Sequence, residues 1–223
     1  MGAIDIHHHY VPGEVVGEAK RHGRTLGIEV AEAKDGTVRF SFNGGPKHPL
    51  LQGLTDVEPR LAMMEKGKIA LAALDPSTQL LGYDLQGDKA ESWCRIYNDC
   101  VNEFVQKYPE RFTAMAAVPI QEPARAAKVL EYAVNKLGFR CAYTATNVNH
   151  PYYDSEDFDP FWAKAEELDA HVFMHPDNPA GTDLMGSFGL RLVCGNPADT
   201  TLSLGLLIYS GVFDRFPNLK LCT

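Results

Sequence analysis

Three consecutive histidines near the start of the chain have the spacing to bind a metal ion. They end a strand-like run, Ala3–His9, and side chains in a strand alternate between its two faces. His7 and His9 therefore point the same way, while His8 points to the opposite face. Two imidazoles on one face at the end of a strand can share a divalent metal. Core histidines and an expression tag are the competing interpretations, but a tag does not sit inside a strand pattern directly after Ile4-Asp5-Ile6.

A further histidine, His175, closes a second strand-like run at 171–175. The carboxyl ends of parallel strands form the functional face of α/β sheets and barrels. His171 shares the face of His175 but lies four residues back, roughly 13 Å along a strand, and we interpret it as structural. We predict that His7, His9 and His175 supply three nitrogen ligands. Such a set suits Zn²⁺ and other borderline divalent metals.

Strand-like and helix-like runs alternate along the chain, which is typical of a parallel sheet with helices outside it. After the first strand we predict strands at 69–74, which ends at Asp75-Pro76, and at 112–118, 140–148, 171–175 and 219–223. Helices are predicted at 56–66, 89–108, 122–137, 159–168 and 199–213. This pattern predicts an α/β fold, a (β/α)8 TIM-type barrel of which about six of the eight strands are present.

Residues 13–54 interrupt this rhythm, and we interpret them as a small inserted β-hairpin flap. Within them, Ile28–Ala33 and Thr37–Phe42 flank Lys34-Asp35-Gly36. Asp-Gly between two alternating runs is a strong hairpin signal. The prediction is one metal-dependent barrel domain over residues 1–223, incomplete on its C-terminal side, with the flap inserted at 13–54.

Composition excludes several classes of partner. The formal net charge of -8 argues against nucleic acid and anionic membrane surfaces, because the field of the protein repels phosphates. Small anionic substrates stay compatible, since a local arginine or metal overrides that field. The N-terminus lacks the pattern of a signal peptide, and the apolar stretch 202–213 is too short to span a bilayer. Five scattered cysteines without a CxxC pair indicate buried thiols, and we expect a cytoplasmic protein.

These residues, with several longer motifs, resemble the amidohydrolase superfamily. The similarity is greatest to its branch containing aminocarboxymuconate-semialdehyde decarboxylase and related aromatic-acid decarboxylases, and it covers nearly the whole chain except the flap. The motifs are Asp5-x-His7-x-His9, Tyr108-Pro109-x-Arg111-Phe112, Asp159-Pro160-x-Trp162, His175-Pro176, the run from Gly195 to Thr201 and the run from Gly211 to Leu221.

The resemblance implies a mononuclear site that holds one divalent metal ion, usually zinc, with a bound water. It also implies a proton-transferring His after the sixth strand and an Asp after the eighth strand that completes the metal shell. We expect that catalytic His to lie beyond Thr223, so it has no counterpart here. Dinuclear relatives use a modified Lys in the fourth strand. Residues 140–148 contain no Lys, which favours one metal over two.

Two residues are candidates for binding substrate. The guanidinium of Arg191 could hold a substrate carboxylate in bidentate fashion, or form an exposed ion pair. Asn178, beside Asp177, could reach substrate or belong to a turn. The best-known decarboxylase of the branch binds substrate with a flap arginine that has no clear counterpart here. The polar flap residues are Arg39, Asn43 and Lys47.

Other polar residues near the predicted site have less specific interpretations. Thr144, Thr146 and Asn147 end the 140–148 strand and form either a polar wall of the site or ordinary strand ends. We expect Asp5 to orient a backbone group or cap its strand rather than bind metal.

Family proximity favours a non-oxidative decarboxylase, a C–C lyase, acting on a small carboxylated unsaturated or aromatic acid. The alternative is a metal-dependent hydrolase or hydratase of a small lactone, amide or ester, which would need the same ion. A second alternative is a truncated fragment without catalysis, since six strands of an eight-stranded barrel expose two sheet edges. We expect a small-molecule carboxylate as partner, and the resemblance implies a homodimer.

Overall fold

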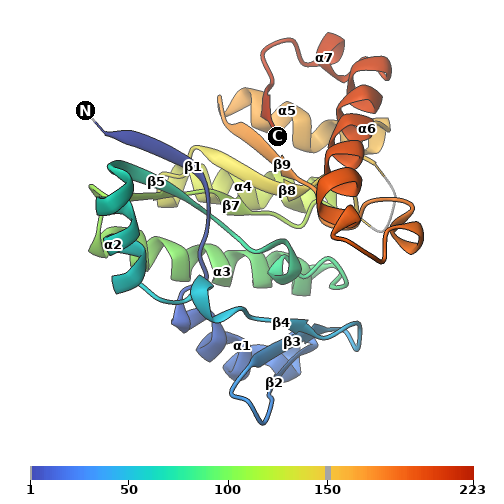
Figure 1. Cartoon of the computed structure of the whole chain (residues 1–223). Coiled ribbons are helices and arrows are strands. Elements are labelled where there is room, and N and C mark those ends of the chain that lie inside the picture. Colours follow the sequence, from blue (N-terminus) through green and yellow to red (C-terminus); the bar gives the residue numbers. More distant parts are fainter. Residues whose placement is uncertain (1, 149–151) are drawn as a thin grey trace.

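The computed structural model describes residues 2–148 and 152–223 of the chain. Its main strands run parallel, and their spatial order follows the chain, as Figure 1 shows. One sheet has the order β1-β5-β6 and another has the order β7-β8-β9-β10. These strands are β1 (Ala3–His9), β5 (Ile69–Asp75), β6 (Phe112–Ala114), β7 (Ala116–Ala117), β8 (Cys141–Ala145), β9 (His171–His175) and β10 (Lys220–Cys222).

Strands β6 and β7 are the two halves of the single strand predicted at 112–118. The break falls at Met115, whose backbone N–H still donates to the carbonyl of Leu74 in β5 (2.8 Å). The two sheets are therefore successive parts of one parallel layer. Strands β1 and β10 stand at the ends of its order, and neither pairs with a further strand among residues 2–148 and 152–223. The predicted α/β class is confirmed, while closure into an eight-stranded barrel stays a prediction.

Helices connect consecutive strands of this layer, as the alternating pattern predicted. Helix α2 precedes β5, α3 follows it, α4 follows β7, α5 follows β8, and α6 and α7 follow β9. In the described part of the chain, no helix is both long and apolar enough to cross a membrane. The bounds are α2 (Glu58–Gly67), α3 (Asp88–Lys107), α4 (Pro123–Leu137), α5 (Asp159–Glu167), α6 (Asn196–Tyr209) and α7 (Val212–Arg215).

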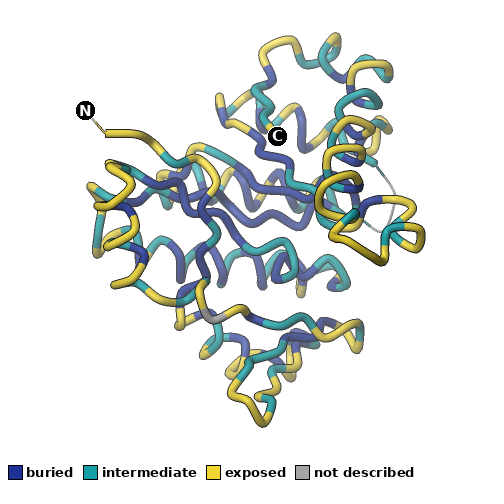
Figure 2. Tube along the Cα trace, in the orientation of Figure 1, coloured by how far each residue is buried: buried dark blue, intermediate teal, exposed yellow. Residues whose placement is uncertain are grey.

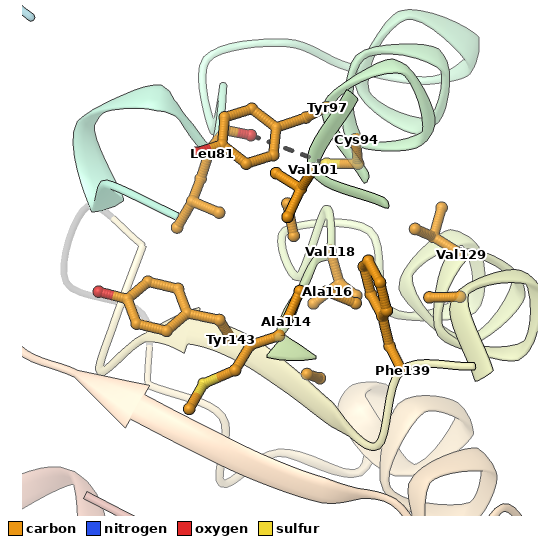
Figure 3. Close-up of a cluster of buried hydrophobic side chains, with 14 of the residues drawn as sticks. Leu81, Cys94, Tyr97, Val101, Ala114, Ala116, Val118, Val129, Phe139 and Tyr143 are labelled. Atoms are coloured by element: carbon orange, nitrogen blue, oxygen red, sulfur yellow. Dashed lines mark hydrogen bonds between the residues drawn. The ribbon is translucent and has the colours of Figure 1, made fainter. Parts of the chain in front are cut away.

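Helix α3 shows how the sequence packs this layer. Trp93, Tyr97 and Val101 recur at four-residue spacing, which places them on one face, and all three are buried. Figure 3 shows part of this face beside the small residues of β6 and β7. Asn98, also buried, donates to the carbonyl of Ala117 (3.0 Å) and accepts from its N–H (2.8 Å). The helix thereby satisfies the polar backbone of a short strand while it covers the strand's apolar side.

The predicted hairpin is present in the inserted segment. Strand β2 (Ile28–Glu32) pairs antiparallel with β3 (Val38–Phe42), and Gly36 takes a left-handed φ of 81° in the turn. A short third strand, β4 (His48–Pro49), pairs with the other side of β3. The three strands lie below α3 in Figure 1 and form a small sheet separate from the parallel layer.

The inserted segment also contains helix α1 (Gly13–Leu26), which the interpretation of 13–54 as a hairpin flap did not include. The helix packs against α3 and β2 with Val15 among its buried residues. Its three glycines lower the intrinsic helix propensity of the segment, so the sequence carries no clear helical signal there. A side chain at Gly23 would place its Cβ 2.3 Å from the carbonyl oxygen of Ile28. Glycine therefore lets the helix lie directly against the strand that follows it.

Burial is concentrated on the middle parallel strands, β5 to β9, and on the inner sides of the helices that cover them, which are dark blue in Figure 2. Most of β1, by contrast, is exposed. Cys94 and Cys100 are buried, as predicted. Cys194 is exposed, so the prediction of buried thiols is wrong at that position. It lies in the π-helical turn η5 (Arg191–Gly195), where the neighbouring Leu192 and Val193 are exposed as well. This turn leads from the loop after β9 into α6, and it carries Arg191.

Candidate metal centre

The structure brings together the three histidines that the sequence singled out. The candidate ligand atoms of His7, His9 and His175 all lie within 4.8 Å of one another. The ring centroids are 4.8 Å apart for His7 and His9, 4.9 Å for His7 and His175, and 5.2 Å for His9 and His175. The rings meet edge to face. Because one ligand nitrogen of each ring lies within 4.8 Å of the others, the three nitrogens surround one small volume.

Curvature of the parallel layer makes this convergence possible. β1 and β9 are four strand steps apart in the order β1, β5, β6–β7, β8, β9. In a flat sheet they would lie about 19 Å apart. The contact of His7 with both Phe173 (ring centroids 5.4 Å) and His175 shows that the layer curls until its first and fifth strands face each other. The side chains of the metal centre therefore point into the hollow of a barrel-like wall.

The geometry fits a divalent metal ion. Nε2 of His7 lies 3.2 Å from Nε2 of His9. Two nitrogens bound to one tetrahedral ion at about 2.0–2.1 Å would be separated by about 3.3 Å. Nδ1 of His175 is buried and has no hydrogen-bond partner among the described residues. A buried imidazole nitrogen without a protein partner among these residues, beside two further imidazole nitrogens at this spacing, suits a metal site.

The protonation state of His175 also suits a ligand. Burial lowers the pKa of this imidazole to about 4, and the neighbouring rings of His9 and His7 act in the same direction. At neutral pH His175 is therefore uncharged, with a lone pair available for a cation.

Asp75, which sequence reasoning recorded only as the end of a strand, lies directly behind the cluster. It pairs in register with His9 across β1 and β5 and is 1 % exposed. Its Oδ2 accepts the backbone N–H of His8 (2.5 Å), and its Oδ1 contacts Nδ1 of His9. The signal that could have revealed it is a charged residue ending an otherwise apolar strand, followed by proline.

His8 and Asp5 lie outside the cluster. His8 is buried, and its Nδ1 contacts Oδ2 of Asp5 (2.7 Å). Asp5 also accepts the backbone N–H of His7 (3.1 Å), so it orients the strand end, as we expected. His171, at the other end of β9, is exposed and takes no part in the cluster.

Arg191 and Asn178 share a pocket of about 290 Å³. Asn147, two residues beyond β8, and Asp177, two residues beyond His175, line it as well. The pocket therefore opens at the carboxyl ends of the strands, at the same edge of the layer as the histidines. The guanidinium of Arg191 donates to the backbone carbonyl of Asp177, and no carboxylate within residues 2–148 and 152–223 forms an ion pair with it.

The flap contributes Phe42, Pro46 and His48 to the same pocket, none of which the sequence singled out. Of the three polar flap residues Arg39, Asn43 and Lys47, Asn43 donates to the carbonyl of Asp84 (3.3 Å), which ties the flap to the pocket's edge. Arg39 and Lys47 are not among the lining residues. No spacing rule links a histidine in a two-residue strand to a pocket built by distant loops, so the sequence carried no signal for His48.

A buried carboxylate, Asp199, ties together the polar residues at the end of β8. It accepts from the hydroxyl groups of Thr146 and Tyr152 (2.6 Å for Tyr152) and from the amide of Asn147 (3.1 Å). Burial, followed by the bond to Asp199, raises the pKa of Tyr152. Asn147 also donates to the carbonyl of Asn178 (3.3 Å). Asn147 therefore forms part of the polar wall of the pocket, as one of the two interpretations expected, whereas Thr146 does not line the pocket and is tied to it through Asp199.

Comparison with known proteins places this geometry in a family. A family model described as amidohydrolase matches residues 4–223. A 2-amino-3-carboxymuconate-6-semialdehyde decarboxylase of Dictyostelium discoideum is 25 % identical over 219 residues, 98 % of this chain and 61 % of that protein. Decarboxylase orsB of Emericella nidulans is 34 % identical over 202 residues, 83 % of this chain and 60 % of that protein.

A solved structure shows the same fold. The crystal structure of a dihydroxybenzoic acid decarboxylase from Polaromonas sp., with bound manganese and the inhibitor 2-nitroresorcinol, matches with a TM-score of 0.73 at 24 % identity. The match covers 99 % of this chain and 64 % of that one. The chain thus spans about 60 % of the length of the curated relatives described above. The resemblance that the motifs carried is confirmed, and the chain belongs to the amidohydrolase family.

Proposed function

We propose that this protein is a metal-dependent decarboxylase that removes CO₂, without oxidation, from a small carboxylated aromatic or unsaturated acid. The observation that carries the proposal is the set of three converging imidazoles at the strand ends. They lie on the same edge as a pocket whose arginine forms no ion pair with a carboxylate among the described residues. Two of the relatives described above are named as decarboxylases, and their similarity extends over most of this chain. This supports decarboxylation over hydrolysis.

In this proposal His7, His9 and His175 hold one divalent ion. When bound, such an ion supplies a Lewis acid that polarises an oxygen of the substrate. Arg191 receives the substrate carboxylate through charge-assisted hydrogen bonds, and Asn178 offers its amide at the same wall. The flap closes the pocket with Phe42 and His48 and reduces access of water. The proton that replaces CO₂ needs a donor, which we do not assign among the described residues.

We propose Zn²⁺ or Mn²⁺ as the ion. Three nitrogen donors suit zinc, whereas the relative from Polaromonas sp. was solved with manganese. The further expectations of a cytoplasmic protein and a homodimer also stay proposals. They rest on the scattered free cysteines and on the family resemblance, respectively.

The test is CO₂ release by purified protein loaded with Zn²⁺ or with Mn²⁺, assayed on a panel of dihydroxybenzoic acids and carboxylated dienes. The proposal expects CO₂ release that a chelator abolishes and that the same metal restores. A matched panel of lactones and esters distinguishes the hydrolase. Metal-dependent turnover of that panel without CO₂ release from the acids would move the chain to the hydrolytic members of the family.

A further inference from the structure

Each oxygen of the Asp75 carboxylate contacts a nitrogen of β1, which fixes the orientation of the side chain. Its Oδ2 lies 2.5 Å from the backbone nitrogen of His8, and its Oδ1 contacts Nδ1 of His9. Both atoms of the second contact are buried, and neither has a hydrogen-bond partner among the described residues, so each has only the other within reach. The pairing of His9 with Asp75 in the register of β1 and β5 holds the two side chains opposite each other.

The roles of donor and acceptor follow from the chemistry of these groups. A backbone N–H can only donate, so Oδ2 accepts from His8. An ionised carboxylate has no proton to give, so Oδ1 also accepts, and Nδ1 of His9 must carry the proton. A neutral imidazole has only one N–H. Nε2 of His9 therefore keeps its lone pair, and this is the nitrogen that lies 3.2 Å from Nε2 of His7.

His9 differs in this respect from the other two histidines of the cluster. No carboxylate in the described part of the chain contacts the ring of His7 or that of His175. The contact of Asp5 goes to His8, which lies outside the cluster. Of the three clustered histidines, His9 is therefore the one whose tautomer is selected by a carboxylate among the described residues.

We propose that Asp75 is a positioning residue of the metal centre, which holds His9 in the Nδ1–H tautomer so that Nε2 is free to bind the ion. The inference rests on the proposed metal site but makes a separate claim about the metal-free protein. Carboxylates behind metal-bound histidines orient the ring and raise ligand basicity, and their loss lowers metal affinity by about 10–100-fold.

The decisive variant is Asp75→Asn. An asparagine has one carbonyl oxygen and one NH₂ group, and the backbone N–H of His8 will take the oxygen. The NH₂ group then faces His9 and turns Nδ1 into an acceptor, which moves the proton to Nε2. The substitution keeps the shape of the side chain but selects the tautomer that cannot bind a metal through Nε2, in the manner known for a catalytic triad whose aspartate is replaced by asparagine.

Nitrogen-15 NMR of the histidine rings in metal-free protein reads this change directly, with His9→Gln used to assign the His9 signals. We expect the Nδ1–H form of His9 in the wild type and the Nε2–H form in Asp75→Asn. Zn²⁺ affinity, measured by competition with a chromophoric chelator, should fall by about 10–100-fold in the variant. Asp5→Asn is the matched control, because it removes a carboxylate–histidine contact on the same strand and should leave the His9 tautomer unchanged.

The wild-type spectrum alone can overturn the proposal, so it stays testable even if Asp75→Asn does not fold. An Nε2–H form of His9 in the metal-free wild type would disprove the role of Asp75, as would an unchanged tautomer in folded Asp75→Asn. Expected tautomers combined with no Zn²⁺ or Mn²⁺ binding by the wild type would instead contradict the proposed metal site, and only the claim that Asp75 selects the His9 tautomer would stand.

Discussion

Two clusters of polar side chains lie at the carboxyl ends of the strands, and the protein satisfies them to different degrees. In the cluster around Asp199, one buried carboxylate receives hydrogen bonds from Thr146, Asn147 and Tyr152. In the histidine cluster, imidazole nitrogens from two strands face one another, and Nδ1 of His175 has no hydrogen-bond partner among the described residues.

This difference indicates that the Asp199 cluster stabilises the fold and that the histidine cluster is a binding site. A buried polar network with every member paired makes the fold rigid, whereas one with unpaired members is unfavourable until something binds. The Asp199 network joins the end of β8 to α6 and needs no ligand to be stable. In the histidine cluster, lone pairs of several imidazole nitrogens face one another, and a bound cation would accept them. The following experiments test whether the two clusters really divide these tasks.

Removal of one histidine should have the largest effect. We expect His175→Ala to weaken Zn²⁺ binding by on the order of 1000-fold, because one of three protein ligands is lost. Competition with a chelator measures the affinity. His171→Ala is the control, since this exposed residue begins the same strand outside the cluster. Equal losses in both variants would mean that the effect comes from β9 and not from the metal centre.

The second cluster should respond in stability and not in metal affinity. Asp199→Ala leaves Thr146, Asn147 and Tyr152 without their common acceptor, and we expect a loss of about 3 kcal/mol in the free energy of unfolding. Urea denaturation measures it. Asp183→Ala, at an exposed position, should change the same free energy by less than about 0.5 kcal/mol. A large loss of Zn²⁺ affinity in folded Asp199→Ala would show that the clusters are coupled.

Metal should stabilise the folded chain through the first cluster. At a free Zn²⁺ concentration of 100 times Kd, linkage predicts about 2.7 kcal/mol of added stability in the wild type. Thermal or urea unfolding with and without Zn²⁺ measures this increment. Asp199→Ala should keep the increment, and His175→Ala should lose it. An increment that survives in His175→Ala would place the bound zinc elsewhere.

The smallest effect is expected at the pocket wall. Arg191→Ala removes the guanidinium that we propose to receive a substrate carboxylate, at an exposed position, so we expect roughly a 10-fold rise in KM. Arg191→Lys should restore part of the loss because it keeps the charge but not the planar fork. Zn²⁺ affinity should be unchanged in both. A fall in kcat at constant KM would argue against a role in binding the ground-state substrate.

Much of the candidate site could be predicted because it depends on local periodicity. The alternation of strand side chains put His7 and His9 on one face and separated His8 from them. The rule that functional residues gather at the carboxyl ends of parallel strands selected His175 over His171. Both rules depend on a few consecutive residues, so they can be applied to the sequence without knowledge of the fold.

The parts that were missed depend on approach between distant segments. Helix α1 was missed because its glycines weaken the helical signal, and the close contact of Gly23 with Ile28 that explains one of them is tertiary. His48 entered the pocket because the flap folds over the ends of β8 and β9, which are distant from it in the chain. Asp75 and Asp199 are single acidic residues whose partners lie 67 and 53 positions away.

By itself, the sequence determined the α/β class, the hairpin between Ile28 and Phe42, and the three histidines that face a common edge. These follow from side-chain periodicity and turn chemistry, which act over short distances along the chain. The tertiary structure alone decided that β1 curls round to meet β9, that Arg191 and the flap share a pocket, and that Asp75 stands behind His9. Each of these requires the curvature and register of the parallel strands, because only they bring residues far apart in the chain to within hydrogen-bond distance.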